Sequence, residues 1–315
     1  MVGGLARPAL ADPARPSNYE SIVEGIDPAT DAADFEVTGG DAFLMVTVRP
    51  GHSVAIPGYF GEPYIRVDPD GGVWVNRDSP ALYINEDRFG DAAAPPGVDG
   101  TGEPTWEQAG SDGVYAWHDH RSHWMSRDLP PTVAGDTRQT VFPWEIPVTI
   151  DGVDSVVSGE LVWIPSAMRW SPVLAGVIGL LALTFNPRNW MTVMAFLAAV
   201  AATIGVVVVV AQNAGTPAVA RGLPVEALVP GAALLVATLA ITRGRLATLG
   251  PPQLLFVAGA VLVVWALSHV SVLWLPVLVS AAPPPLERVA VAFVAWAGVG
   301  VVVAAVRMAL DQVRS

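Results

Sequence analysis

The stretch "VSGELVWIPSAMRWSPVLAGVIGLLAL", residues 157–183, marks the point at which the chain changes character. Its first part alternates apolar and polar residues, as a half-buried β-strand does. After Trp170 charged residues become rare, and Val, Ala, Leu and Gly dominate the rest of the chain. Most of the 29 acidic residues precede residue 165. This shift predicts a water-soluble N-terminal domain followed by a membrane-spanning domain.

The overall composition excludes several kinds of site. The chain has 315 residues, a net charge of -12 and no cysteine. Disulfides, thiolate zinc sites, catalytic thiols and blue-copper sites that use a cysteine are therefore excluded. An acidic soluble half without a basic stripe also argues against nucleic acid as a partner.

The region 34–165 has the turn and strand pattern of an all-β domain. Its clearest hairpin is "YIRVDPDGGVWVN" (64–76), in which two alternating segments flank a Pro-Asp-Gly-Gly turn. Further strand pairs are predicted around Gly39–Asp41 and around Asp151–Gly152. Several short strands at this spacing predict an antiparallel sandwich of the immunoglobulin or cupredoxin type.

Residues 1–33 are interpreted as a leader followed by an extended segment. Ala9-Leu10-Ala11 has the small-x-small form of a signal-peptide cleavage site, and a polar segment that contains proline follows it. We interpret the leader as the remnant of a signal peptide that ends near Ala11. The alternative is a disordered leader in which this tripeptide occurs by chance.

The apolar half predicts a bundle of about five transmembrane helices within residues 166–315, because its apolar runs approach the roughly 20 residues that cross a bilayer. The predicted spans are 171–186, 190–211, 227–242, 253–280 and 288–309. The fourth span is long and contains Pro276, so a kink or an early end is expected there.

The distribution of arginine predicts the orientation of these spans. One set of connections and the C-terminal end hold five arginines: Arg188, Arg243, Arg245, Arg307 and Arg314. The opposite set holds three: Arg169, Arg221 and Arg288. By the positive-inside rule, the chain is predicted to be a multi-pass cell-membrane protein with an extracytoplasmic N-terminal domain and a cytoplasmic C-terminus.

The candidate functional site is the stretch "YAWHDHRSHWM", residues 115–125, which holds three of the five histidines. If the strand continues to His120, then His118 and His120 project from one face with Cα atoms about 6.6 Å apart. His123 is expected to reach the same ion through a turn, and Met125 adds a thioether. Three imidazoles suit Cu(II) or Zn(II), and a thioether suits Cu(I).

Asp119 and His52 are also part of the metal-site hypothesis, and two other interpretations of the histidine cluster stay open. Asp119 is expected to point to the other face and to pair with Arg121. His52, which lies in a turn-like stretch, is a further candidate ligand. The cluster can instead be a structural or interfacial surface with cation–π contacts, or a proton-sensing group.

His269, in "WALSHVSVLW", is the one clear ionisable candidate within the predicted spans. It can bind haem, a metal ion or a proton. Alternatively, it hydrogen-bonds to a neighbouring helix or lies near the outer interface. Motifs for phosphate-binding loops, serine hydrolases and zinc proteases do not occur in the chain.

The β-domain with its histidine cluster, joined to a multi-span region, resembles bacterial copper-handling membrane proteins of the CopC–CopD type. The segment "VTIDGVDSVVSGELVWIP" resembles the closing hairpin of the CopC domain. The resemblance is one of architecture, and it implies copper binding outside the cytoplasm. The family's own histidine positions have no counterpart here, since cleavage after Ala11 exposes Asp12 and Val153 follows the Asp151–Gly152 turn.

The sequence therefore predicts a membrane-anchored copper-binding protein for copper acquisition, delivery or tolerance, with zinc as the alternative metal. The predicted ligands are His118, His120, His123, Met125 and His52. The alternative function is a non-enzymatic scaffold or accessory subunit whose β-domain binds a partner protein. Catalysis is the less favoured interpretation, and the expected surroundings are the lipid bilayer and a protein partner.

Overall fold

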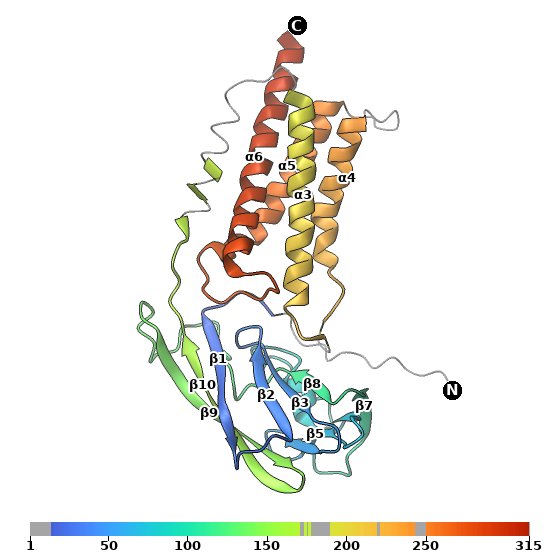
Figure 1. Ribbon diagram of the computed structural model, residues 1–315, viewed down its shortest axis with the longest axis vertical. Coiled ribbons are helices and arrows are strands. Elements are labelled where there is room, and N and C mark those ends of the chain that lie inside the picture. The colour runs from blue at the N-terminus through green and yellow to red at the C-terminus, as the bar shows by residue number, and fades with distance from the viewer. Residues whose placement is uncertain are drawn as a thin grey trace, which may run out of the picture. The chain divides into compact units, whose positions relative to one another are not determined.

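The computed structural model describes residues 14–170, 173–174, 176–177, 190–218, 221–242 and 250–314. The chain divides into two compact units, one built from strands and one from helices (Figure 1). The strand unit contains Met1–Ser166 together with two short connections of the helical region, Gly215–Arg221 and Pro276–Val279. The helical unit contains the remaining residues.

The N-terminal unit is an antiparallel β-sandwich, which confirms the predicted fold class. Its strands are β1 (Tyr19–Asp27), β2 (Ala33–Thr38), β3 (Phe43–Val48), β4 (Val54–Pro57), β5 (Pro63–Val67), β6 (Val73–Asn76), β7 (Trp106–Gly110), β8 (Val114–Trp117), β9 (Gln139–Ile150) and β10 (Val153–Trp163). One sheet has the order β1-β10-β9-β4-β5-β6-β7, and the other has the order β2-β3-β8. A short helix, α1 (Pro80–Ile84), follows β6.

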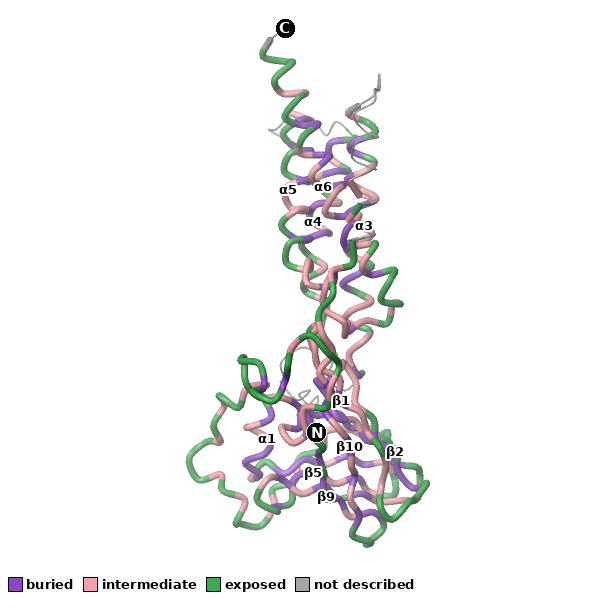
Figure 2. Tube along the Cα trace, turned by 90° about the vertical axis from the view of Figure 1, so that its left-hand side faces the viewer, coloured by how far each residue is buried: buried purple, intermediate pink, exposed green. Residues whose placement is uncertain are grey.

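The core of the sandwich is made by the alternating apolar residues of both sheets. Leu44 and Val46 of β3 belong to the same buried cluster as Val67 of β5 and Ile146 of β9. At about 25 cal/mol per Å² of apolar surface, burial of such side chains is the main stabilising contribution. Figure 2 shows the buried segments of the strand unit in purple.

The turns of the hairpins follow the predicted residues. Asp151 and Gly152 both have positive φ, 51° and 79°, as a two-residue turn between twisted strands requires. They join β9 and β10, the two longest strands. The hairpin of β5 and β6 is also present, with Arg66 opposite Trp74.

The predicted β-domain boundary at residue 34 is wrong, because β1 lies before it. This strand pairs with β10 from Tyr19 opposite Trp163 to Asp27 opposite Val156. Its sequence, "YESIVEGID", alternates poorly, and Ser21 is its one fully buried residue. The interpretation of residues 1–33 as leader and extended segment therefore missed a strand of the larger sheet. The proposed cleavage site near Ala11 lies outside the described residues.

The described part of the helical unit contains four helices that are long and apolar enough to cross a membrane, which supports a multi-pass membrane protein. They are α3 (Trp190–Ala214), α4 (Leu228–Thr242) taken together with the short 3-10 helix that precedes it from Val225, α5 (Pro251–Ser268) and α6 (Pro284–Arg314). Two short 3-10 helices accompany them: η2 (Val225–Ala227) and η3 (Val270–Leu273). The first predicted span, 171–186, falls mostly outside the described residues.

The fourth predicted span, 253–280, is too long. Helix α5 ends at Ser268, His269 caps it, and the chain continues through η3 to Pro276. The apolar composition continues to residue 280, so hydropathy alone extends the span past its end. The helix therefore ends early, as expected. It ends at Ser268, and η3 lies between this end and Pro276.

Helices α5 and α6 approach closely at two glycines. A Cβ atom on Gly298 would lie 3.0 Å from the Gly259 carbonyl oxygen, and a Cβ atom on Gly259 would lie 2.9 Å from the Gly298 carbonyl oxygen. Small residues at such crossings let helix backbones touch in a membrane.

Gly298→Leu is therefore expected to destabilise the helical unit by about 1–3 kcal/mol, because overpacking forces the helices apart. The measurement is unfolding of the full chain in detergent. Gly231→Leu is the matched control, since nothing lies within 4 Å of a Cβ atom at Gly231. Equal stability of the two variants would contradict the close crossing.

Candidate functional site

The histidine cluster lies on a turn that follows β8. This strand pairs with β3 only from Val114, opposite Thr47, to Trp117, opposite Leu44. The predicted extension of the strand to His120 is therefore wrong. The physical reason is Asp119, whose backbone carbonyl accepts a hydrogen bond from the Ser122 N–H at 3.0 Å and reverses the chain.

The side chain of Asp119 anchors this turn. It is fully buried and accepts hydrogen bonds from Arg121 Nε at 2.8 Å, from Arg121 Nη2 at 2.7 Å and from Trp117 Nε1 at 2.9 Å. The predicted pairing of Asp119 with Arg121 is present. Burial lowers the pKa of the Arg121 guanidinium, but the hydrogen bonds and charge of Asp119 outweigh burial and raise this pKa above its usual value.

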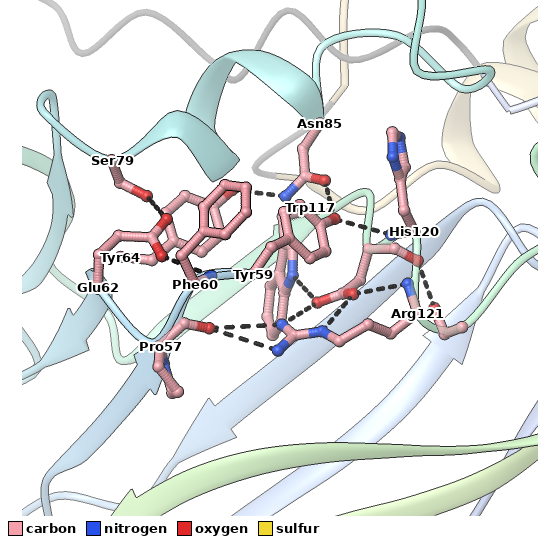
Figure 3. A network of polar contacts seen from close by, with 12 residues as sticks. Pro57, Tyr59, Phe60, Glu62, Tyr64, Ser79, Asn85, Trp117, His120 and Arg121 are labelled. Atoms are coloured by element: carbon pink, nitrogen blue, oxygen red, sulfur yellow. Dashed lines mark hydrogen bonds and ion pairs between the residues drawn. The ribbon is translucent and has the colours of Figure 1, made fainter. Parts of the chain in front are cut away.

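A network of polar contacts surrounds this pair (Figure 3). The Arg121 guanidinium lies over the Tyr59 ring, 5.2 Å from its centroid. The Tyr59 hydroxyl accepts a hydrogen bond from the His120 backbone N–H at 2.9 Å and donates one to Asn85. Asn85 in turn donates to the buried Tyr64 hydroxyl at 3.2 Å. The turn with the histidines is thus held by Tyr59 of the loop between β4 and β5, and through it by Asn85 at the C-terminal cap of α1 and Tyr64 of β5.

The three imidazole rings meet around His123. Its ring centroid lies 6.0 Å from that of His118 and 5.0 Å from that of His120, in edge contacts. The His118 ring stacks on Phe43 at 4.7 Å, and the His120 ring stacks on Tyr59 at 5.9 Å. The structure therefore brings the three predicted histidines together, but through His123 and not through one shared strand face.

His123 is the most constrained member of the cluster. It is 1% exposed, and its Nδ1 lies 3.3 Å from the Trp124 carbonyl oxygen. Its Nε2 atom is buried without a hydrogen-bond partner among the described residues. Burial, followed by the charges of Arg88, His120 and His118, lowers the pKa of His123 to about 2. The ring is therefore neutral at physiological pH, which is the form that binds metal ions.

A buried ion pair lies close to the cluster. The Arg88 side chain is 21% exposed and binds Asp41, whose side chain is 1% exposed. Burial raises the pKa of Asp41, although the charge and hydrogen bond of Arg88 act in the opposite direction. The two residues are 47 positions apart in the chain, so no local sequence pattern connects them.

Met125 lies beside His120. Both side chains adjoin Gly90. A Cβ atom placed on Gly90 would lie 2.8 Å from the Met125 Cε atom and 3.5 Å from the His120 Cε1 atom. Met125 is 39% exposed, so it sits at the outer edge of the cluster. A thioether at this place can join an ion that His120 holds.

The structure does not bring His52 to the cluster. Its Nδ1 atom lies 2.6 Å from an Asp151 carboxylate oxygen, at the turn between β9 and β10. Both side chains are about 40% exposed. The turn adjoins Val54, the first residue of β4, which pairs with Ile150. Arg121 of the cluster instead contacts the carbonyl oxygen of Pro57, the last residue of β4. His52 and the cluster therefore lie at opposite ends of this strand. The Ser53 N–H, followed by His52, lowers the pKa of Asp151, so His52 acts as a partner of this turn.

The cluster fits a metal ion only after its rings turn. Within the described residues no group of three or more His, Asp or Glu side chains is arranged to hold an ion. Two imidazoles on one ion have ring centres about 5 Å apart, given a metal–nitrogen length of about 2.0 Å. The 5.0 Å spacing of His120 and His123 matches, whereas the 6.0 Å spacing of His118 and His123 is wide. If His120 binds an ion through Nε2, it has to release the Asp87 carbonyl oxygen at 2.9 Å, whereas binding through Nδ1 keeps this contact.

A second feature of the domain is the loop "GYFGE" at residues 58–62. Glu62 is 6% exposed and accepts hydrogen bonds from Ser79 Oγ at 2.8 Å and from the Phe60 N–H at 3.0 Å. The loop therefore holds a buried carboxylate beneath Phe60, whose side chain is 76% exposed. Tyr64 belongs to the buried core, and Tyr59 is partly buried and packs against it.

The helical unit contains the remaining candidate, His269. Its ring stacks on Trp265 at 4.3 Å, its Nδ1 lies 3.0 Å from the Trp265 carbonyl oxygen, and its Nε2 lies 3.7 Å from the Glu226 carboxylate. The hydrogen bond to Trp265 lies within α5, and the Glu226 contact is an ion-pair distance from the segment before α4. Among the described residues, His269 does not make the predicted hydrogen bond to a neighbouring helix. A scan against protein-family models and searches of curated proteins and of solved structures returned no match. The resemblance to CopC–CopD type proteins therefore stays a prediction.

Proposed function

We propose that this chain is a membrane-anchored protein whose β-domain binds one copper ion, or alternatively zinc, outside the cytoplasm, for copper acquisition, delivery or tolerance. The proposed ligands are His118, His120 and His123, with Met125 as an additional ligand for Cu(I). The observation that carries the proposal is the buried, neutral His123 ring, whose Nε2 has no partner among the described residues. His52 is no longer part of the proposed site, because its ring is bound to Asp151.

The chemistry of the cluster agrees with this proposal. Neutral imidazoles bind Cu(II) and Zn(II), and a buried lone pair without a donor is costly unless a ligand occupies it. The Arg88 charge opposes a cation, but Asp41 pairs with it and reduces its field. Loss of the stacking contacts with Phe43 and Tyr59 is the cost of turning the rings.

The arginine distribution of the sequence supports an extracytoplasmic β-domain. Arg243 and Arg245 lie between α4 and α5, and Arg307 and Arg314 lie at the C-terminal end, whereas the opposite set holds Arg169, Arg221 and Arg288. Positively charged connections favour the cytoplasmic side, so the β-domain is proposed to lie on the opposite side.

Metal binding by the full chain in lipid nanodiscs tests the proposal. We expect one Cu(II) per chain, with an electron spin resonance spectrum that shows nitrogen ligands. His123→Ala and His120→Ala are each expected to weaken binding by about 100-fold or more, since even outer partners of metal ligands contribute about 10–100-fold.

Two histidines outside the cluster provide matched controls. His52→Ala and His269→Ala are expected to bind the metal as the unchanged chain does. The proposal fails if the unchanged chain binds neither copper nor zinc saturably, or if the cluster variants and the control variants bind equally.

The exposed Phe60 favours a second candidate function, the binding of a partner protein by the β-domain. An aromatic residue that is 76% exposed, on a loop whose backbone is bound to a buried carboxylate, is a candidate interface anchor. Phe60→Ser is expected to abolish co-purification of a stable partner, whereas Leu129→Ser, at a side chain that is 45% exposed, is expected to leave it unchanged. Retention of the partner by Phe60→Ser would contradict this function.

A further inference from the structure

The helical unit contains a buried carboxylate that the proposed metal site does not use. Glu287, in the first turn of α6, is 2% exposed. Its Oε1 atom accepts a hydrogen bond from Gln212 Nε2 of α3 at 2.7 Å. Its Oε2 atom is buried and has no hydrogen-bond partner among the described residues.

Helix capping does not account for this carboxylate. A glutamate in the first turn usually accepts a bond from the backbone N–H of the N-cap residue. Here the residue before α6 is Pro283, and the first two residues of the helix are Pro284 and Pro285, so none of the three has an N–H. The Leu286 and Glu287 N–H groups both donate to the Pro283 carbonyl oxygen.

The neighbouring helices bring few charges to Glu287. Described α3 and α5 contain no charged residue, and Gln212 is the polar group that α3 contributes. On α6 the Arg288 guanidinium points to η3 and donates to the Val272 carbonyl oxygen at 2.9 Å and to the Leu275 carbonyl oxygen at 3.0 Å. Arg288 is coupled electrostatically both to Arg169 and to Glu287 itself, so its charge acts on this carboxylate along α6.

Two further ionisable groups of the described helical unit, Glu226 and His269, lie close to each other. Glu226, just before α4, faces His269 at the end of α5 at 3.7 Å. The segment before α6 is tied to α3 as well, because the Ala281 N–H donates to the Ala211 carbonyl oxygen at 2.9 Å. Glu287 and Gln212 therefore face each other at a junction that backbone contacts hold in place.

We propose that Glu287 and Gln212 form a proton-binding site in the helical bundle. An ionised carboxylate buried with one bare oxygen is costly, and a proton on Oε2 removes the charge. Buried ionisable groups in membrane bundles commonly mark proton or ion sites. This site is independent of the proposed metal site, which lies in the other unit.

Gln212 suits both states of such a site. Its Nε2 donates to the ionised carboxylate, as the present contact shows. Its side-chain oxygen can accept a hydrogen bond from the protonated acid, because an amide carries a donor and an acceptor on one group. A proton that enters from water is thus bound as Oε2–H, and no other bond is made or broken.

Labelling with dicyclohexylcarbodiimide tests this proposal on the full chain in lipid nanodiscs. The reagent reacts with buried protonated carboxylic acids and forms a stable adduct that mass spectrometry locates. We expect an adduct on Glu287 whose yield rises as the pH falls. Infrared difference spectra should show the carbonyl band of a protonated acid over the same pH interval, and Glu287→Gln should lose both signals.

Two further variants separate proton binding from a purely structural role. Gln212→Leu removes the donor to the ionised form and is expected to raise the initial labelling rate about tenfold at fixed pH. Asp311→Asn, at an exposed position near the other end of α6, should change neither signal. The proposal is overturned if the unchanged chain shows no adduct on Glu287 at any pH at which it stays folded. It is also overturned if Glu287→Gln keeps the infrared band.

Discussion

Replacing Asp119 by alanine is expected to lower the free energy of unfolding of the β-domain by about 3–5 kcal/mol, because the change breaks a buried ion pair and leaves its partner behind. The Arg121 guanidinium would lose both of its bonds to the carboxylate, and Trp117 Nε1 would become a buried donor without an acceptor. The turn that brings His120 and His123 together would lose its anchor, so the ring contacts of the cluster should disappear as well.

Hydrogen–deuterium exchange of the full chain at increasing urea concentration measures this loss, on peptides that cover β3, β8 and the turn. Asp154→Ala is the matched control, since Asp154 is exposed and its change is expected to cost less than 1 kcal/mol. Asp119→Asn keeps the shape but removes the charge, and should fall between the two. A loss below about 1 kcal/mol for Asp119→Ala would show that the pair does not hold the turn.

Replacing Arg88 by methionine is expected to cost a similar 3–5 kcal/mol, for the opposite reason. The change would leave the Asp41 carboxylate, 1% exposed, without its compensating charge. Burial already raises the pKa of Asp41, and without Arg88 that pKa should rise further. The loss should therefore be larger at neutral pH than in acid, where protonation of Asp41 removes the uncompensated charge.

A double variant and a surface pair test the reason for this loss. Arg88→Met combined with Asp41→Leu replaces both charges by apolar groups and should recover most of the lost stability. Arg49→Met breaks the pair with Asp31, in which both side chains are more than half exposed, and should cost less than about 1 kcal/mol. If the double variant is as unstable as Arg88→Met alone, the loss comes from packing and not from an unpaired charge.

Much of the fold could be predicted because it depends on local patterns. The turns at Gly39–Asp41 and at Asp151–Gly152 occur where residues that tolerate positive φ stand between apolar segments. The apolar helices occur where charges are absent over the length of a span. Strand β1 escaped prediction because both faces of "YESIVEGID" carry polar residues, so its place at the sheet edge has no periodic signal.

The sequence predicted which histidines form the candidate site, but not how their rings are oriented. The close spacing of His118, His120 and His123 already predicted that their rings would meet. Their directions depend on Phe43 and Tyr59, which stack on two of the rings from distant strands and loops. The local alternation rule failed here because Asp119 ends the strand.

The sequence by itself determined the division into an acidic β-domain and an apolar helical region, the turns of the main hairpins and the absence of thiolate chemistry. These properties follow from composition and from residues adjacent in the chain. The tertiary structure alone decided that His52 binds Asp151, that Arg88 binds Asp41, and that Glu287 is buried against Gln212. Each of these contacts joins residues at least 47 positions apart, and their energies depend on burial, which only the packed chain creates.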